Sequence, residues 1–228
     1  MEKTEWLDGW KLHKIISPKL PYNLHGDQCC LMQEAGEKLF GLGALLDYTG
    51  LNLPEIHRLG TSGNFAIRLP NKPKRFLVTR RDAHKGYLTQ DDFSLVFEVD
   101  WDSRLVYVNT ALGTQPSTDS LLVAKTFEID DKVMAWAHFH EAVDTEFAVK
   151  INYPALGKKD WDALGRMVEK GVRIINMIDH DLLRKGGVAD GKPDAAIIIG
   201  EDPRETFKLA IKLAQKAFLD KNSVSNLA

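Results

Sequence analysis

Long apolar segments are missing from this sequence of 228 residues. Its longest purely aliphatic run, Ala195–Ile199, is far shorter than the stretch of about 20 apolar residues that a membrane-spanning helix needs. The first ten residues are rich in charge and lack the apolar stretch that is typical of a signal peptide. We therefore expect a cytoplasmic protein that has no membrane partner.

The sequence also has few cysteines and no excess of basic residues. The two cysteines, Cys29 and Cys30, are neighbours in the sequence, and neighbours rarely satisfy disulfide geometry, so both are expected to be reduced thiols on a helix. Lysine and arginine total 30 against 32 aspartate and glutamate residues, which gives a net charge of −2. Because no basic excess is available to neutralise a phosphate backbone, nucleic acid is excluded as the main partner.

Internal repeats, low-complexity tracts and Ser/Gly-rich linkers are also absent. A chain of 228 residues, 44% of them hydrophobic, suits one globular domain, because chains divide into several domains only somewhat beyond this size. The prediction is a single domain over residues 1–228, in which residues 1–26 form an irregular N-terminal arm.

The sequence does contain segments with helical periodicity. Apolar residues at a spacing of three or four predict helices over residues 28–48, 117–128 and 161–182. Asp27 is expected to be the N-cap of the first. In the third, Gly171 and the β-branched residues that follow it would also tolerate a strand.

A final helix and several strands complete the expected fold. Asp202, with proline next to it and Glu205 three residues later, is typical of a helix start. Helices that flank a mainly antiparallel sheet predict a layered α/β/α domain, which is an α/β fold class. Short β-like segments bounded by turn residues are expected at Phe65–Leu69, Phe76–Thr79, Leu95–Val99, Leu105–Asn109, Val133–His138 and Ala195–Gly200.

Two histidines stand two residues apart at the end of one of these strands. Successive side chains of a strand point to opposite faces, so His138 and His140 are expected to point to the same side. Two parallel imidazoles are well placed to share one cation, and zinc would need at least one further protein ligand. The alternative is a pair of histidines on a β edge without a metal, because this spacing is common by chance.

Four segments, taken in order, make the context of this pair more specific. A Gly-Asn turn leads into a strand, a strand end runs into a Lys-Gly-x-Leu-Thr-x-x-Asp turn, a Pro-Ser segment starts a helix, and the His-x-His strand end follows. In this order they resemble the class II aldolase/adducin-like family over roughly residues 27–220. The segments are Gly60–Arg68, Val78–Phe93, Gln115–Leu122 and His138–His140.

The resemblance implies a divalent cation, usually zinc, that three histidines hold. Two of these match His138 and His140. An ungapped comparison back from Gly200 places Asp194, not a histidine, at the third position. A carboxylate oxygen can ligate zinc, so Asp194 is the preferred third ligand and His180 is the alternative.

The resemblance also implies an acid/base and a substrate-binding set. Asp119 falls where the family has its catalytic glutamate, although a residue of this type before a helix could merely cap it. Asn64, Ser117 and Thr118 fall at positions that bind the substrate's phosphate or its oxygens. Arg81 stands in the phosphate loop, where the family has Ser/Thr-Gly, and could supply a charged fork for an anion.

A basic cluster lies around this loop. It is either an anion-attracting rim near the site or the solvated face of a hairpin. Its members are Arg68, Lys72, Lys74, Arg75, Arg80, Arg81 and Lys85.

Together these features predict a metal-dependent lyase. Its reaction would be aldolase-type C–C cleavage through a metal-stabilised enediolate, on a small hydroxy-carbonyl or sugar-phosphate-like substrate that is anionic. An epimerase or dehydratase on the same scaffold is one alternative, and a non-catalytic, adducin-like binding protein is the other. The family also implies assembly into a homotetramer.

Overall fold

The structure is a computed structural model that describes residues 6–7, 10–14, 25–48, 60–72, 74–81, 83–102, 105–110, 115–151, 158–180 and 188–225. Within these residues the chain forms a ten-stranded sheet in the order β1-β2-β6-β5-β4-β3-β7-β10-β9-β8. The strands are β1 (Trp6–Leu7), β2 (Trp10–Lys14), β3 (Asn64–Arg68), β4 (Phe76–Thr79), β5 (Phe93–Asp100), β6 (Leu105–Asn109), β7 (Ala135–Phe139), β8 (Ala148–Lys150), β9 (Ile174–Ile178) and β10 (Pro193–Gly200).

The sheet is mainly antiparallel, as the sequence predicts. Among neighbouring strands that the structure describes, only the pairs β2–β6 and β8–β9 are parallel. The strands predicted from β-like segments are present, with bounds within two residues of those expected. The predicted N-terminal arm lies largely outside the described residues, apart from β1 and β2.

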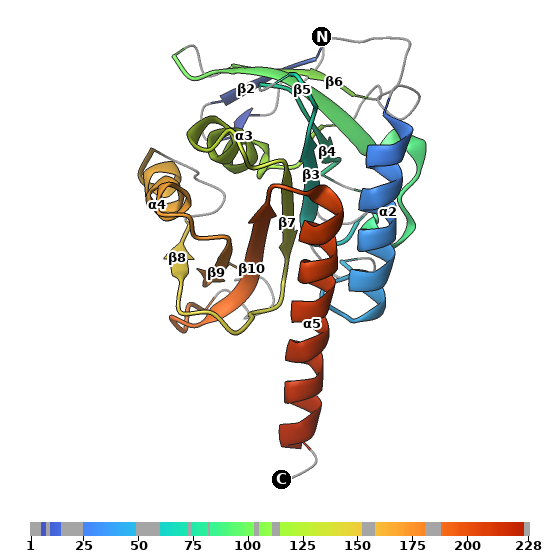
Figure 1. The fold of residues 1–228 in the computed structure, drawn as a ribbon, viewed down its shortest axis with the longest axis vertical. Helices are drawn as coiled ribbons and strands as arrows, with labels where there is room; N and C mark the ends of the chain where they lie inside the picture. Colours follow the sequence, from blue (N-terminus) through green and yellow to red (C-terminus); the bar gives the residue numbers. More distant parts are fainter. Residues whose placement is uncertain are drawn as a thin grey trace.

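Helices cover both faces of the sheet, which confirms the layered α/β/α arrangement (Figure 1). On one face α2 (Gly26–Gly41) and α5 (Pro203–Ser225) lie side by side, and the C-terminal half of α5 extends past the sheet. On the other face α3 (Ser120–Ile129) packs against α4 (Lys158–Glu169). Each helix pair buries its own cluster of apolar side chains against the sheet. None of the described helices is both long enough and apolar enough to cross a membrane.

Helix α2 begins and ends earlier than the sequence predicts. Its N-cap is His25, not Asp27, and it ends at Gly41 instead of residue 48. The stop is a Schellman motif, in which Gly43 takes a φ of +70° and the N–H of Ala44 donates to the carbonyl of Leu39. Glycine adopts this left-handed backbone without strain. The predicted free thiols Cys29 and Cys30 both lie on this helix.

The long helix predicted over residues 161–182 is wrong. Helix α4 ends at Glu169, and Gly171, with a φ of +79°, forms a second Schellman motif. There the N–H of Val172 donates to the carbonyl of Met167. The β-branched residues that follow are stiff at χ1 and favour the extended strand β9, which was the alternative.

The two remaining helix starts depend on local polar groups. At α5 the predicted cap is confirmed, because Asp202 Oδ1 accepts the backbone N–H of Glu205 at 2.9 Å. Helix α3 starts at Ser120, three residues later than predicted, because a turn precedes it in which the N–H of Ser120 donates to the carbonyl of Ser117.

Candidate active site

Three histidines from two strand ends converge on one face of the sheet. His138 lies on β7, His140 follows that strand, and His180 lies two residues beyond the end of β9. One ring nitrogen from each lies within 4.8 Å of the other two. The Nε2 atoms of His138 and His180 are 3.0 Å apart. We call these three residues the histidine cluster.

The donor set of the histidine cluster fits a divalent cation. The Nδ1–H of His138 donates to the carbonyl of Ala196 at 3.0 Å, so its Nε2 lone pair faces the other rings. Burial, followed by the charges of His138 and His140, holds the pKa of His180 well below its usual value, so that ring is neutral at pH 7. Because zinc–nitrogen bonds measure about 2.0–2.1 Å, two nitrogens on a tetrahedral ion lie about 3.3 Å apart, close to the separation of these Nε2 atoms.

Asp194 takes a different place from the one that the sequence comparison favours. Its Oδ1 accepts the backbone N–H of His180 at 2.8 Å, so the carboxylate contacts the main chain of this histidine. The group of potential ligands found among the described residues contains His180 and not Asp194. The geometry therefore favours the alternative, His180, as the third ligand.

Backbone contacts fix the positions of the first two histidines. In the register of the sheet His138 on β7 stands opposite Asn64 on β3. Gly63, which precedes Asn64, has a φ of +77°, and an added Cβ would collide with the carbonyl oxygen of His138. The N–H of His140 donates to the carbonyl of Ala44 at 2.9 Å, so the glycine stop of α2 places the acceptor that holds this residue.

Asp119 is buried before the first turn of α3, where the sequence leaves two roles open. Its side chain makes no capping hydrogen bond. Instead, Asn64 Nδ2 donates to Asp119 Oδ2. Directly opposed residues of an antiparallel pair have neighbouring side chains on the same face, so Asn64 lies between His138 and Asp119. This arrangement argues against the capping role.

The surroundings of Asp119 suit a group that exchanges protons near neutral pH. Burial raises the pKa of Asp119 to about 7, while the hydrogen bond from Asn64 and the charge of Lys85 act in the opposite direction. A carboxyl with a pKa near the working pH can both accept and donate a proton. The residue is only 5% exposed, so little water surrounds its carboxyl group.

This raised pKa predicts that the free energy of unfolding of the metal-free protein falls as the pH rises. For Asp119 the favourable contribution to folding is complete below the unfolded pKa of about 3.9 and is lost as pH rises through about 7. The wild-type protein should therefore lose free energy of unfolding relative to Asp119→Asn between pH 4 and 8, by at most about 4 kcal/mol. Urea unfolding of both proteins in chelator checks this, and a constant difference across the range would contradict it.

The predicted substrate-binding residues gather around Asp119. The Oγ of Ser117 accepts the N–H of Asp119 at 3.3 Å, and the half-buried Thr118 lies between them in the chain. The backbone N–H of Arg81 donates to the carbonyl of Gln115 at 3.0 Å, which joins the loop after β4 to the segment before α3. Asn64 Oδ1 is buried and has no hydrogen-bond partner among the described residues, so it is an acceptor available to a ligand.

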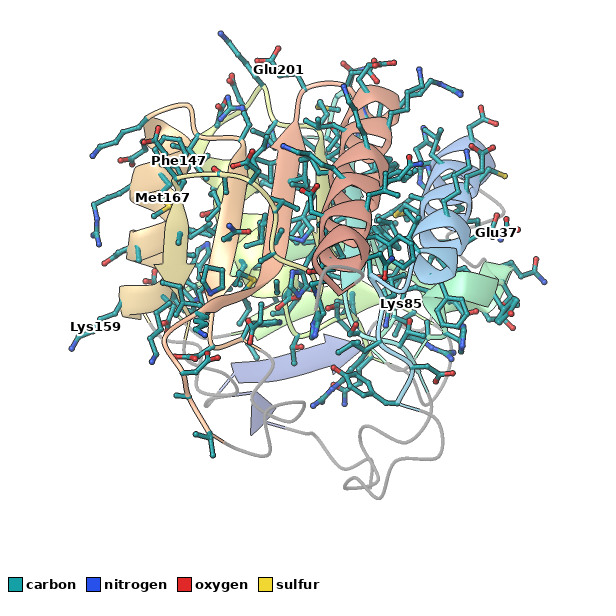
Figure 2. All side chains as sticks on the ribbon, turned by 90° about the horizontal axis from the view of Figure 1, so that it is seen from below. Glu37, Lys85, Phe147, Lys159, Met167 and Glu201 are labelled. Carbon is teal, nitrogen blue, oxygen red and sulfur yellow. The ribbon has the colours of Figure 1, made fainter. Side chains whose placement is uncertain are left out.

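The predicted anion-attracting rim is wrong for two of its basic residues. Arg68 is buried and donates to carbonyl groups at the C-terminal end of α3, including that of Asp131 at 2.7 Å. Lys85 is also buried, and Figure 2 shows it within the fold, whereas Lys159 reaches outward at the periphery. Neither side chain is available to attract a ligand from solvent.

Lys85 is a residue of the site that the sequence analysis named only as a member of the basic cluster, without a role of its own. Its Nζ donates to the carbonyl of Thr61 at 2.8 Å and to that of Arg81 at 3.2 Å. It thereby ties the turn before Asn64 to the loop after β4, and its charge acts on Asp119. The available signal was the glycine that follows Lys85 in the Val78–Phe93 segment. A Cβ at Gly86 would collide with the side chain of Phe40, so this glycine marks a place where the chain packs closely against α2.

Comparison with known proteins gives one family and several structural relatives. Residues 55–217 match the family described as Class II Aldolase and Adducin N-terminal domain. The methylthioribulose-1-phosphate dehydratase of Gluconacetobacter diazotrophicus is 38% identical over 85 residues. That alignment spans 37% of this chain and 37% of the dehydratase, so the similarity covers well under two thirds of the relative.

Among solved structures, YgbL from Klebsiella pneumoniae superposes with a TM-score of 0.57 at 14% identity, covering 85% of this chain and 88% of YgbL. The L-fuculose 1-phosphate aldolase from Glaciozyma antarctica PI12 superposes with a TM-score of 0.54 at 12% identity, covering 93% of this chain and 78% of the aldolase. At such low identity these likenesses show a shared fold and not a shared reaction.

Proposed function

The chain belongs to the family of class II aldolase and adducin N-terminal domains, and from this premise we propose that it is a metal-dependent lyase. Its reaction would be aldolase-type C–C cleavage of a small, anionic hydroxy-carbonyl compound such as a sugar phosphate. The observation that carries the proposal is the position of Asn64, which stands opposite His138 of the histidine cluster in the sheet and donates to the buried carboxyl of Asp119.

His138, His140 and His180 would hold the cation, and each offers one ring nitrogen from a strand end. When bound, a divalent cation, which we propose to be Zn²⁺, supplies a Lewis acid that polarises a substrate carbonyl. The protein contributes the positions of the three rings. The carbonyl of Ala196 fixes the orientation of His138, and the carbonyl of Ala44 fixes the backbone of His140.

Asp119 would take and return the proton at its carboxyl group. Asn64 holds this carboxyl through Nδ2 and offers Oδ1 to a substrate hydroxyl. Ser117 and Thr118 would bind substrate oxygens beside it, and Arg81 would contact the anionic group. The burial of His138, His140 and Asp119 also limits the access of water to the reacting atoms. Assembly as a homotetramer stays a prediction.

Removal of metal tests this proposal directly. The purified protein should contain about one divalent ion per chain, and exposure to a strong chelator should abolish cleavage of its sugar-phosphate substrate until Zn²⁺ is restored. The measurement combines elemental analysis with the detection of carbonyl fragments from a panel of ketose and aldose phosphates. A metal-free protein without turnover, whose melting temperature ignores chelators, would favour the adducin-like binding protein instead.

A dehydratase is the second candidate, and the similarity to methylthioribulose-1-phosphate dehydratase supports it. The same cluster and the same carboxyl would serve, because both reactions need a base and build up negative charge next to a carbonyl group. In cleavage the carboxyl would take the proton of the hydroxyl group at the broken C–C bond. In dehydration it would take the C–H proton next to the carbonyl, and the neighbouring hydroxyl would leave as water. Product masses distinguish the two reactions with methylthioribulose 1-phosphate as the substrate. Cleavage yields two smaller carbonyl compounds, whereas dehydration yields one product that has lost a single water.

A further inference from the structure

We propose that Asp194 is a positioning residue, which sets the third imidazole of the metal site by holding the backbone of His180 from a bulge in β10. The inference rests on the proposed function, since it concerns the same histidine cluster. Asp194 Oδ1 accepts the N–H of His180 at 2.8 Å, and this contact links the end of β9 to its neighbouring strand.

The bulge explains why Asp194 can reach this N–H. In the ladder between β9 and β10, Pro193 pairs with Ile178 and Ala195 pairs with Met177, so Asp194 is an extra residue without a counterpart on β9. An extra residue bends the strand and re-aims its own side chain. The carboxylate is thereby turned along the ladder toward the residue that leaves the end of β9.

The residue before His180 is also fixed by several contacts. Asp179, directly before His180, takes a φ of +52°, a left-handed conformation that turns the chain out of β9. Its buried carboxylate accepts the N–H groups of Asp190 and Gly191 at 2.9 Å each and pairs with Lys150 on β8 at 3.1 Å. With Asp179 fixed, the orientation of the next peptide group determines where the ring of His180 points.

A hydrogen-bond acceptor at Asp194 supplies that orientation. The peptide N–H of His180 would otherwise lie at a strand end without the acceptor of a regular ladder. His180 can thus contribute its ring from β9 to a cluster whose other two members come from β7, two strands away in the sheet order.

Zinc affinity of the full-length chain tests the proposal, measured by competition with a chromogenic chelator. Asp194→Ala removes the acceptor and should weaken Zn²⁺ binding about 10–100-fold, the usual effect of losing a group that orients a ligand. Asp194→Asn keeps a carbonyl oxygen at the same place and should stay close to wild type. In a chain that already carries His180→Ala, the Asp194→Ala change should add less than about twofold, because no ring is left to position.

Asp190→Ala is the matched control, since Asp190 is an exposed aspartate of the segment just before β10, and its Oδ1 accepts the N–H of Lys192 instead. It should bind Zn²⁺ like the wild type. If Asp194→Ala binds Zn²⁺ with wild-type affinity, the inference is overturned but the proposed function is not. The inference is also overturned if Asp194→Asn binds Zn²⁺ as weakly as Asp194→Ala. The site would then need the charge of Asp194, or its direct ligation of the ion, and not merely a hydrogen-bond acceptor. A wild-type chain that binds no Zn²⁺ would overturn the inference together with the proposed function.

Discussion

Replacement of Asp119 by asparagine is expected to abolish turnover while leaving the bound metal in place. The amide has the shape of the carboxyl but cannot accept a proton, so the rate should fall by about 10²–10⁴-fold, as for the loss of a general acid–base group. Asp119 is not a member of the histidine cluster, so metal content should remain about one ion per chain. Steady-state kinetics and elemental analysis of the same preparation measure both quantities.

A second buried aspartate provides the control for this variant. Asp160 on α4 is buried to a similar degree as Asp119 but belongs to a different helix. Asp160→Asn should therefore retain turnover, which separates loss of a reacting group from the general effect of neutralising a buried carboxyl. Activity that survives Asp119→Asn would remove Asp119 from the mechanism and leave its buried position as a feature of packing.

Replacement of His138 by alanine is expected to have the largest effect on metal binding. His138 contributes one of three ring nitrogens and is itself fixed by the carbonyl of Ala196. Loss of a group that orients a ligand weakens metal binding about 10–100-fold. Loss of a direct ligand should weaken Zn²⁺ binding by more than this. Turnover should fall to the level of the chelated wild type. Competition with a chelator and the metal content per chain measure the loss.

His84→Ala is the control, because His84 lies outside the histidine cluster and packs against Phe40 and Tyr87. It should keep wild-type metal content. His138 is almost fully buried, so the alanine variant also leaves a small cavity. His140→Ala, which removes a second ligand from the end of the same strand, shows whether the loss follows the ligand set. Normal zinc affinity in both cluster variants would contradict the metal site.

Much of the fold could be predicted because its signals are local. Short apolar segments bounded by turn residues define β3 to β7, and the parity of a strand alone places His138 and His140 on one side. The end of α4 is a different case. An apolar spacing of three or four continues past Gly171 into β9, so periodicity favours a helix there, and only the β-branched residues argue for a strand.

The parts of the site that sequence reasoning left open depend on contacts between distant residues. Asp119 before a helix is compatible with a cap, and what argues against that role is Asn64, 55 residues earlier in the chain. His180 joins the cluster only because the chain leaves β9 in a left-handed turn beside the bulge at Asp194. The buried lysine, Lys85, is found within a run of basic residues that is also typical of a solvated surface.

The place of β7 in the sheet sets the route by which an ion would leave. β7 is flanked by β3 and β10, far from either edge, so its backbone amides should exchange with solvent only when the whole protein unfolds. β9 is separated from the sheet edge by the short strand β8 alone, and opening there costs less free energy. His138 and His140 would therefore be the last ligands to release the ion. The lifetime of the bound ion would be set by how often the end of β9 that carries His180 opens.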